Sequence, residues 1–452
     1  MPSSQPTPPS ALSRSVAIIG AGAAGLCAAR ELRLEGHNVA VYERENQIGG
    51  TWVYTPKVES DPIGLDPSRT LVHSSLYHSL RTNLPREAMG FRAYPFSAKD
   101  GPQRDPRRFP SHREVLLYLE DYASEFGLSE LVRFETEVCY VGLMEGGKWE
   151  VRSRRRRDGE QVDLDEIYDA VVVCNGHYTE PRIAEIPGID AWPGEQLHSH
   201  NYRTPEPLRD QVIILIGSAA SAVDISRDIA RVAKEVHIAS RSVADGAFGK
   251  QPGYDNMWLH SMIESVHEDG TVVFRDGSVV LADVILHCTG YKYHFPFLET
   301  NGAVTVDDNC VGPLYKHVFP PVLAPWLSFI GLPWKVVPFP MFEFQSKWIA
   351  GVLSGRIALP SQEEMMEDVK AFYSTLKASG TPKRYTHNMA DNQFEYNDWL
   401  AAECGIPASE EWREEMYSAA SKNRRARPET YRDEWEDEHL VLEAHDDFKK
   451  NL

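Results

Sequence analysis

The sequence predicts an α/β protein with two Rossmann-like units, each made of an apolar strand, a turn of small residues and a helix. The first unit begins with the apolar strand 16–19 and the second with the apolar strand 212–216. A further apolar strand follows the helix of each unit, at 38–42 and at 235–239. This alternation is typical of parallel sheets covered by helices, so we expect two such sheets.

The first turn has the spacing G-x-G-x-x-G at Gly20, Gly22 and Gly25. We expect Gly20 to allow the tight turn, Gly22 to let a pyrophosphate approach the backbone, and Gly25 to let the helix pack on the sheet. The predicted site also includes the intervening residues Ala21, Ala23 and Ala24. Glu43 ends the next strand, where a carboxylate accepts a hydrogen bond from a ribose hydroxyl. A turn without a ligand is the alternative, but the complete order of elements favours dinucleotide binding.

The second turn departs from the ideal spacing, because alanines replace its second and third glycines. Its predicted binding residues are Gly217, Ser218, Ala219, Ala220, Ser221 and Ala222. Ser240 and Arg241 end the following strand, at the place that Glu43 has in the first unit. An arginine there pairs with a 2′-phosphate, whereas a surface arginine at a strand end is the alternative. The contrast between Glu43 and Arg241 predicts FAD in the first unit and NADPH in the second.

Composition limits the classes of function. The 452 residues are 42% hydrophobic and 25% charged, which is ordinary for a globular protein of two or three domains. A formal net charge of −19 argues against non-specific nucleic-acid binding and against a polybasic membrane surface. We expect no membrane anchor, because no apolar run is long enough to span a bilayer. The six cysteines form no C-x-x-C pair, so we expect reduced thiols, no metal site and a cytoplasmic location.

The expected organisation places the NADPH-binding domain inside the FAD-binding domain. A disordered tail covers 1–14, the first part of the FAD-binding domain covers 15–180, and the NADPH-binding domain covers 205–285. The second part of the FAD-binding domain, with a helical C-terminal region, covers 286–452. The highly charged stretch from Arg424 onwards is expected to be exposed.

Two local features lie between the units. A helix is expected over 111–126, with Ser111 and Glu114 forming a capping box at its start. The four arginines at 154–157 precede an Asp-Gly turn at 158–159, which indicates a solvated hairpin tip rather than a nucleic-acid patch.

Two nucleotide units restrict the chemistry to hydride transfer between bound cofactors. Disulfide reductases need a close pair of redox cysteines, which this chain lacks. A serine hydrolase is disfavoured, because no G-x-S-x-G motif occurs. A monooxygenase needs neither, but it needs a dry pocket in which reduced flavin meets oxygen and keeps a C4a-hydroperoxide.

The segment 192–203 (WPGEQLHSHNYR) resembles the fingerprint F-x-G-x-x-x-H-x-x-x-Y of class B flavin-containing monooxygenases, with Trp192 in place of phenylalanine. The motifs at 49–52, at 82–83 and at 288–291 resemble that family in the same order. The residues after 332, including FPMFEFQSKW, resemble the plant branch that oxygenates glucosinolate-type and S-alk(en)yl-cysteine thioethers.

The resemblance implies a role for Asn83 beside the flavin and the nicotinamide, where a neutral amide orients both without supplying a proton. An asparagine that serves the turn before Pro85 is the alternative. The resemblance makes the fingerprint segment a linker that packs near the cofactor, so the H-x-H pair His198 and His200 is not expected to bind a metal. Further expected cofactor residues, weaker for the tyrosines and the glutamine, are Gly50, Thr51, Trp52, Thr82, Val138, Tyr77, Tyr202 and Gln345.

The expected activity is therefore the FAD- and NADPH-dependent transfer of one atom of molecular oxygen to the sulfur of a small thioether. Two alternatives stay open at this point. One is an N-hydroxylating or oxidatively decarboxylating relative, and the other is a non-catalytic protein that binds FAD and NADP(H).

Overall fold

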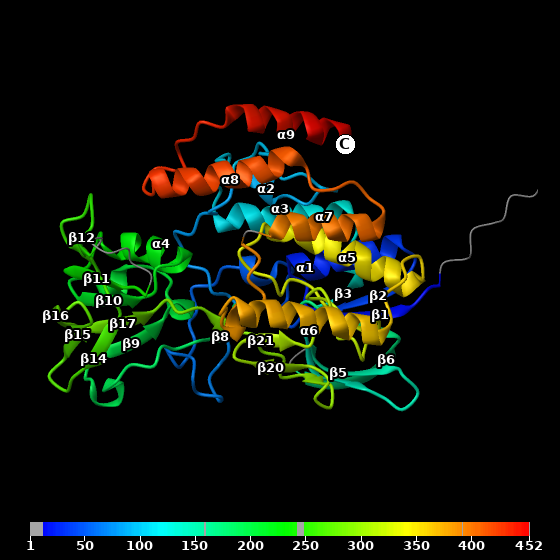
Figure 1. Ribbon diagram of the computed structural model, residues 1–452, viewed down its shortest axis with the longest axis horizontal. Helices are drawn as coiled ribbons and strands as arrows, with labels where there is room; N and C mark the ends of the chain where they lie inside the picture. Colours follow the sequence, from blue (N-terminus) through cyan, green and yellow to red (C-terminus); the bar gives the residue numbers. More distant parts are fainter. Residues whose placement is uncertain (1–11, 158–159, 242–247, 391, 452) are drawn as a thin grey trace, which may run out of the picture.

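The computed structural model describes residues 12–157, 160–241, 248–390 and 392–451. Two α/β lobes lie side by side, the smaller of them drawn in green at the left of Figure 1. Of the expected disordered tail, residues 1–11 lie outside the described residues. Leu12 already contacts the body of the protein, because its N–H donates to the carbonyl oxygen of Ser354 at 3.1 Å.

A five-stranded parallel sheet forms the centre of the larger lobe, in the order β22-β7-β1-β2-β3. Its strands are β1 (Ser15–Ile19), β2 (Asn38–Tyr42), β3 (Val132–Arg133), β7 (Ala170–Val173) and β22 (Leu327–Phe329). The alternation along β1 directs its side chains to opposite faces. Val16 and Ile18 join the core under the helices, whereas Ala17 and Ile19 join the core on the other face.

Helices cover one face of this sheet and a second, antiparallel sheet covers the other. The helices of the covered face include α1 (Ala23–Leu34), α3 (His112–Glu125) and α5 (Pro338–Ser354). The antiparallel strands β4 (Thr136–Leu143), β5 (Trp149–Arg157) and β6 (Glu160–Tyr168) are joined by the parallel β19 (Leu298–Glu299). The pairing of β5 with β6 confirms the expected hairpin, while its turn residues 158–159 lie outside the described residues.

The smaller lobe contains a six-stranded sheet in the order β12-β13-β11-β10-β17-β9, parallel except for β12. Its strands are β9 (Glu195–His198), β10 (Val212–Ile216), β11 (Glu235–Ala239), β12 (Gly249–Lys250), β13 (Met257–His260) and β17 (Val284–His287). Helix α4 (Ala220–Ile229) packs on it, and a three-stranded meander of β14 (Ile263–Val266), β15 (Thr271–Phe274) and β16 (Val279–Leu281) lies nearby (Figure 1).

The smaller lobe is inserted into the larger one. Its sheet takes strands from the chain between β7 and β22, which both belong to the larger lobe. The strands of this sheet come from the chain between the start of β9 and the end of β17, a longer stretch than the expected domain 205–285. Two short antiparallel pairs lie outside these sheets. In one, β8 (Glu180–Pro181) pairs with β18 (Tyr291–Lys292), and in the other, β20 (Thr305–Asp307) pairs with β21 (Cys310–Gly312).

Helices dominate the C-terminal part, as expected. They are α6 (Gln362–Ala378), α7 (Gln393–Cys404), α8 (Glu411–Ala426) and α9 (Glu438–Asn451). The short helices elsewhere are α2 (Arg86–Met89), η1 (Gly50–Trp52), η2 (Ser129–Leu131), η3 (Ile189–Ala191), η4 (Ser199–Asn201), η5 (Glu206–Leu208) and η6 (Lys383–Tyr385). Across the described ranges, we find no helix that is both long and apolar enough to cross a membrane.

The expectation of an exposed end after Arg424 is confirmed only in part, because most of its side chains are exposed but others pack against the rest of the protein. Tyr431 is buried, and α9 packs against α8 through the buried side chains of Leu440, Ala444 and Phe448. The sequence does not indicate this packing, because the stretch is rich in charged residues. In the structure, several of these charged side chains form ion pairs with other parts of the chain.

The expected capping box at the start of α3 does not form. Ser111 occupies the N-cap position without a side-chain hydrogen bond. The carboxylate of Glu114 is buried and instead accepts the N–H of Asp105 at 3.0 Å, with Arg86 3.6 Å away. A nearby guanidinium and a loop amide therefore outcompete the local backbone for this carboxylate.

Candidate cofactor and active site

The first turn connects β1 to α1, and its three glycines meet three different constraints. Gly20 has a φ of +106°, which a residue with a side chain rarely adopts. A β-carbon on Gly25 would lie 1.8 Å from the carbonyl oxygen of Gly20, so the helix requires glycine to pack this closely. A β-carbon on Gly22 would lie in ordinary van der Waals contact with Gly50, 3.5 Å from its α-carbon, so this backbone is not tightly covered. This open backbone fits the approach of a pyrophosphate.

Glu43 is buried directly beneath this turn. One carboxylate oxygen accepts the N–H of Ala21 at 2.9 Å, and the other accepts the N–H of Glu45 at 2.9 Å. Burial raises the pKa of Glu43, against the opposing effect of these two backbone donors. Each oxygen keeps a further lone pair, which a ribose hydroxyl can donate to. The arrangement fits the role that we expect for this residue.

The small residues that follow β2 fold back onto the first turn. Gly49 donates its N–H to the carbonyl oxygen of Ala21 at 3.0 Å. The ring of Trp52 meets Phe339 of α5 edge to face, with 6.4 Å between the ring centroids. The helical turn η1 thereby places three of the expected cofactor residues beside the first turn, namely Gly50, Thr51 and Trp52.

The second turn repeats the backbone of the first. Gly20 donates its N–H to the carbonyl oxygen of Tyr42 at 2.8 Å, and Gly217 donates to that of Ala239 at 2.9 Å. In both units the turn leads directly into a helix, α1 or α4. Of the residues expected to bind in the second unit, Gly217, Ser218 and Ala219 lie before α4, and Ala220, Ser221 and Ala222 lie in its first turn. The strand-end hydrogen bond is therefore shared by the two turns, whereas the alanine at the position of Gly25 means that the second helix does not approach its turn as closely as the first.

Basic groups gather where β11 ends. The hydroxyl of Ser240 donates to that of Ser218 at 2.8 Å, which ties the strand end to the loop. Arg241 follows and is exposed. Burial, and then the nearby Arg241 and Arg384, lower the pKa of Arg182. Sequence reasoning missed Arg182 and Arg384, because they are remote from Arg241 in the chain. Arg384 forms an ion pair with Asp308 at 3.5 Å, so Arg182 and Arg241 carry most of the positive charge that suits an added phosphate here.

Asn83 lies in the long loop that joins the two lobes and is partly buried. The neighbouring Thr82 is fixed, because its N–H donates to Pro110 at 2.9 Å and its hydroxyl donates to Leu84 at 2.9 Å. The side-chain amide of Asn83 itself forms no hydrogen bond with any residue that the structure describes. It is therefore held in place by its neighbours and keeps its donors and acceptor for a ligand.

The two tyrosines that we expect near the cofactors both bind carboxylates of α4. Tyr202 donates to Asp228 at 2.8 Å, and Tyr77 donates to Asp224 at 3.1 Å. Burial, followed by the charge of Asp224, raises the pKa of Tyr77, so the phenol remains a donor. Sequence reasoning missed both aspartates, although their spacing of four places them on one helix face.

Gln345 and Val138 lie farther from the turns. The side chain of Gln345 is buried in α5, where its amide oxygen accepts from Gly331 at 3.0 Å and its amide nitrogen donates to Tyr396 at 2.9 Å. These two hydrogen bonds fix the orientation of its amide within the protein. Val138 lies in β4 and is half-buried beside the second core of the larger lobe. Both residues stay predictions.

The fingerprint segment joins the lobes through β9. A β-carbon on Gly194 would lie 2.2 Å from the ring of Trp192. The position of this ring therefore requires glycine at 194. His198 places Nε2 3.0 Å from the carbonyl oxygen of Gly290, and its Nδ1 accepts the N–H of His200 at 3.0 Å. Within the described residues, no group of three or more His, Cys, Asp or Glu side chains is arranged to hold a metal ion.

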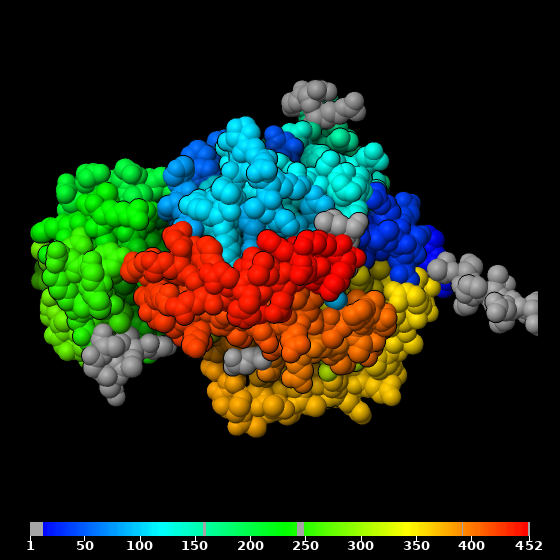
Figure 2. Space-filling view, turned by 90° about the horizontal axis from the view of Figure 1, so that it is seen from above, coloured from blue at the N-terminus to red at the C-terminus, as the bar shows by residue number. Residues whose placement is uncertain are grey.

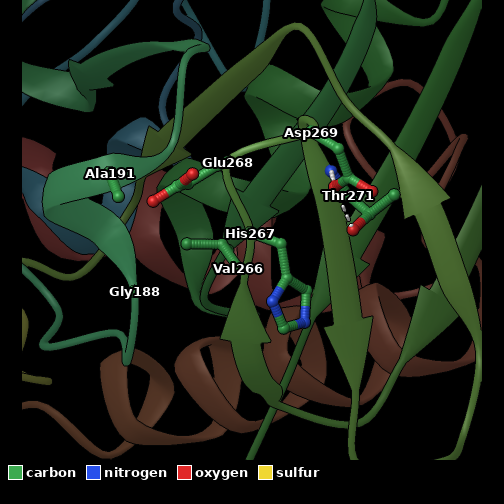
Figure 3. Close-up of a pocket in the computed structure, with 7 residues that line it drawn as sticks. All are labelled: Gly188, Ala191, Val266, His267, Glu268, Asp269 and Thr271. Carbon is green, nitrogen blue, oxygen red and sulfur yellow. Dashed lines mark hydrogen bonds between the residues drawn. The ribbon is translucent and has the colours of Figure 1, made fainter.

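A surface hollow of about 590 Å³ lies elsewhere in the smaller lobe (Figure 3). Its wall contains Gly188, Ala191, Val266, His267, Glu268, Asp269 and Thr271. The carboxylate of Asp269 accepts both the N–H and the hydroxyl of Thr271, which closes the tip of a turn. None of the expected site residues contributes to this hollow, so we do not assign the reaction to it.

Comparison with known proteins identifies the family. The family model described as flavin-binding monooxygenase-like matches residues 13–248 and 254–409. The flavin-containing monooxygenase FMO GS-OX-like 4 of Arabidopsis thaliana is 66% identical over 441 residues, covering 96% of this chain and 97% of its own. FMO GS-OX5 of the same plant is 61% identical over 438 residues, covering 96% of this chain and 95% of its own.

Solved structures agree with this family. The S-allyl-L-cysteine S-oxygenase of Allium sativum has a TM-score of 0.95 and 65% identity, covering 98% of this chain and 100% of that one. Tmm from a Pelagibacter strain has a TM-score of 0.76 and 26% identity, with 93% of each chain covered. These matches confirm the expected fold of two Rossmann-like domains and the expected enzyme class, which uses FAD and NADP(H). The chain belongs to the flavin-binding monooxygenase-like family.

Proposed function

We propose that this enzyme transfers one oxygen atom to the sulfur of a small thioether, with a cysteine-derived or methylthioalkyl metabolite as the substrate class. The observation that carries the substrate class is the 65% identity, over 98% of this chain, to an S-allyl-L-cysteine S-oxygenase. NADPH supplies a hydride, which carries two electrons, and solvent supplies one proton. Molecular oxygen supplies one atom to the sulfur, and its other atom leaves as water. The products are a sulfoxide and NADP⁺.

The two turns have different tasks in this proposal. The first turn and η1 hold the pyrophosphate of FAD, and Glu43 accepts from its ribose. The N-terminus of α4 holds the pyrophosphate of NADPH, and Arg241 pairs with the 2′-phosphate. The support for this division is the opposite charge of Glu43 and Arg241 at equivalent strand ends. Residues 15–180 and 286–452 then form the FAD-binding domain, and the inserted lobe binds NADPH.

The chain's own residues orient the cofactors and exclude water from the site, and they do not act as acids or bases. The bound flavin supplies the redox and oxygen-transfer chemistry. Asn83 orients flavin and nicotinamide through its amide, which neither gains nor loses a proton near neutral pH. The buried Tyr77 and Tyr202 keep the neighbouring junction closed against water. The six free thiols support the proposed cytoplasmic location.

A product assay tests the proposal directly. The purified protein should be yellow, oxidise NADPH in the presence of oxygen, and convert S-allyl-L-cysteine to a sulfoxide that mass spectrometry detects. A methylthioalkyl compound offered in parallel separates the two substrate classes. A hydroxylamine product from an amine, with no sulfoxide from either thioether, would contradict S-oxygenation. A protein that takes up no FAD would contradict the whole proposal.

A further inference from the structure

The inserted lobe is hydrogen-bonded to the loop that leads to Asn83. Asp224 and Asp228 lie one turn apart on the same face of α4. Asp224 accepts from the hydroxyl of Tyr77 at 3.1 Å, and Asp228 accepts from the hydroxyl of Ser79 at 2.9 Å. Two residues shortly before Asn83 are thus fixed to the helix that begins at the second turn.

Arg432 strengthens the same junction from the other end of the chain. Its two terminal nitrogens donate to the two carboxylate oxygens of Asp224, at 3.1 Å and 2.6 Å. Its Nε donates to the carbonyl oxygen of Thr82 at 2.9 Å. One guanidinium therefore joins the carboxylate of α4 to the peptide bond between Thr82 and Asn83. The side chains of Arg432 and Asp224 are 16% and 17% exposed, so water screens the pair weakly.

The segment that carries Arg432, residues 427–437 between α8 and α9, is anchored on both lobes. On the smaller lobe, Arg227 donates to the carbonyl oxygen of Pro428 at 2.9 Å. On the larger lobe, Arg108 binds the carboxylate of Asp437 through both terminal nitrogens. Figure 2 shows the red C-terminal part of the chain lying across the larger lobe and reaching the green, smaller lobe. Arg432 is therefore presented from a fixed backbone.

We propose that Arg432 and Asp224 form a latch between the lobes, with Arg432 as a positioning residue for the oxygenation. The latch sets the distance between the N-terminus of α4 and Asn83, and so between the two places where NADPH and flavin are held. This inference rests on the proposed function for those two places. Arginine suits this place because its planar fork donates two parallel hydrogen bonds to the carboxylate of Asp224 while its Nε reaches the carbonyl oxygen of Thr82. The single ammonium nitrogen of a lysine cannot reproduce the two parallel bonds from separate nitrogens together with the third bond.

The test compares Arg432→Gln, Arg432→Lys and Asp224→Asn in the FAD-loaded enzyme. Glu436→Gln is the matched control, because Glu436 lies in the same segment but is exposed and pairs with Arg427. The first measurement is sulfoxide formed, and hydrogen peroxide released, per NADPH consumed, together with the KM for NADPH. The second is hydrogen–deuterium exchange of the peptide that covers residues 77–84, without substrate or NADPH.

We expect the three latch variants to retain FAD, to raise the KM for NADPH by about tenfold, and to divert several times more NADPH into hydrogen peroxide. Hydrogen–deuterium exchange over 77–84 should be faster in all three variants. Arg432→Lys should restore neither the KM for NADPH nor the slow exchange of the unmodified enzyme. Glu436→Gln should match the unchanged enzyme. If Arg432→Gln fails to fold, Asp224→Asn, which keeps the side-chain size, supplies the same comparison.

Two results would overturn the latch. One is unchanged exchange over 77–84 in the folded variants. The other is faster exchange with an unchanged KM and unchanged peroxide release, which would leave Arg432 a purely structural role. A failure of the unmodified enzyme to form sulfoxide would instead contradict the proposed function, while the exchange measurement would still decide whether the lobes are latched.

Discussion

A β-carbon on Gly20 would lie 2.6 Å from the carbonyl oxygen of Cys174, the residue that follows the neighbouring strand β7. The second lobe repeats this relationship, since a β-carbon on Gly217 would lie 2.6 Å from the carbonyl oxygen of Cys288 after β17. The first glycine of each turn is therefore fixed by the adjacent strand as well as by its positive φ. The two units share this packing although their loop sequences differ.

Two glycines of the first turn have different roles: Gly25 allows close packing of α1, and Gly22 faces the expected pyrophosphate. Gly25→Ala should prevent stable folding, because its β-carbon would overlap the carbonyl oxygen of Gly20. Gly22→Ala should fold normally, since its φ of −75° suits alanine and its nearest neighbour is at 3.5 Å. It should nevertheless weaken FAD binding by about tenfold or more, because the methyl group fills the space for the pyrophosphate. Flavin titration of the refolded protein measures this, and undiminished affinity in Gly22→Ala would contradict the assignment.

Arg241 should determine the preference for NADPH. Because its side chain is exposed, Arg241→Gln should leave stability unchanged. The KM for NADPH should rise by roughly 10- to 100-fold, while the KM for NADH stays the same, since the lost partner is the 2′-phosphate. Steady-state kinetics with both nucleotides measure the change, and Arg209→Gln, at another exposed arginine of this lobe, is the control. Equal losses with NADPH and NADH would assign Arg241 a different task.

Local sequence determined the sheets well. The expected strands 38–42, 212–216 and 235–239 match β2, β10 and β11 residue for residue. Residues 212–216 are an apolar run, whereas apolar and polar residues alternate in 235–239. Each of the three strands ends at a turn of small or charged residues, so its limits are determined by its own sequence. The glycine at 25 could be interpreted in the same way, because its constraint is the carbonyl oxygen of Gly20 in the same turn. The contact of Gly20 with Cys174 could not, because Cys174 belongs to a distant part of the chain.

The latch could not be predicted in this way. Arg432 lies in a charged stretch, and a buried ion pair leaves the same local pattern as two exposed charges. Its partner Asp224 is 208 residues away. The capping box failed for a related reason, because Glu114 finds a partner in Arg86 that no local spacing reveals. Contacts between distant charged residues are decided by the tertiary fold, so only the structure reveals them.

Asn83 should be needed for turnover but not for folding. Asn83→Asp is nearly isosteric and places a negative charge at the expected flavin site, whereas Asn83→Ala removes the amide. Both should retain FAD and lose about 100-fold in kcat, because a preorganised polar group is removed. Sulfoxide formation and FAD content measure these effects, with Asn46→Asp at an exposed asparagine as the control. Full activity in Asn83→Ala would mean that the residue serves only its turn.

Buried neutral histidines should make the enzyme sensitive to acid. Burial lowers the pKa of His198 to about 3, and lowers that of His287 and of His317 to about 4, from the ordinary value of 6.5. Below about pH 6.5 the unfolded chain therefore binds more protons than the folded one, so the free energy of unfolding falls as the pH falls. Each fully titrating histidine contributes up to about 1.4 kcal/mol per pH unit. Denaturant unfolding of the FAD-loaded enzyme between about pH 7.5 and about pH 5 measures this slope. His287→Gln should make it shallower, whereas His267→Gln, at an exposed histidine, should not change it. An unchanged slope in His287→Gln would show that this imidazole accepts a proton in the folded protein.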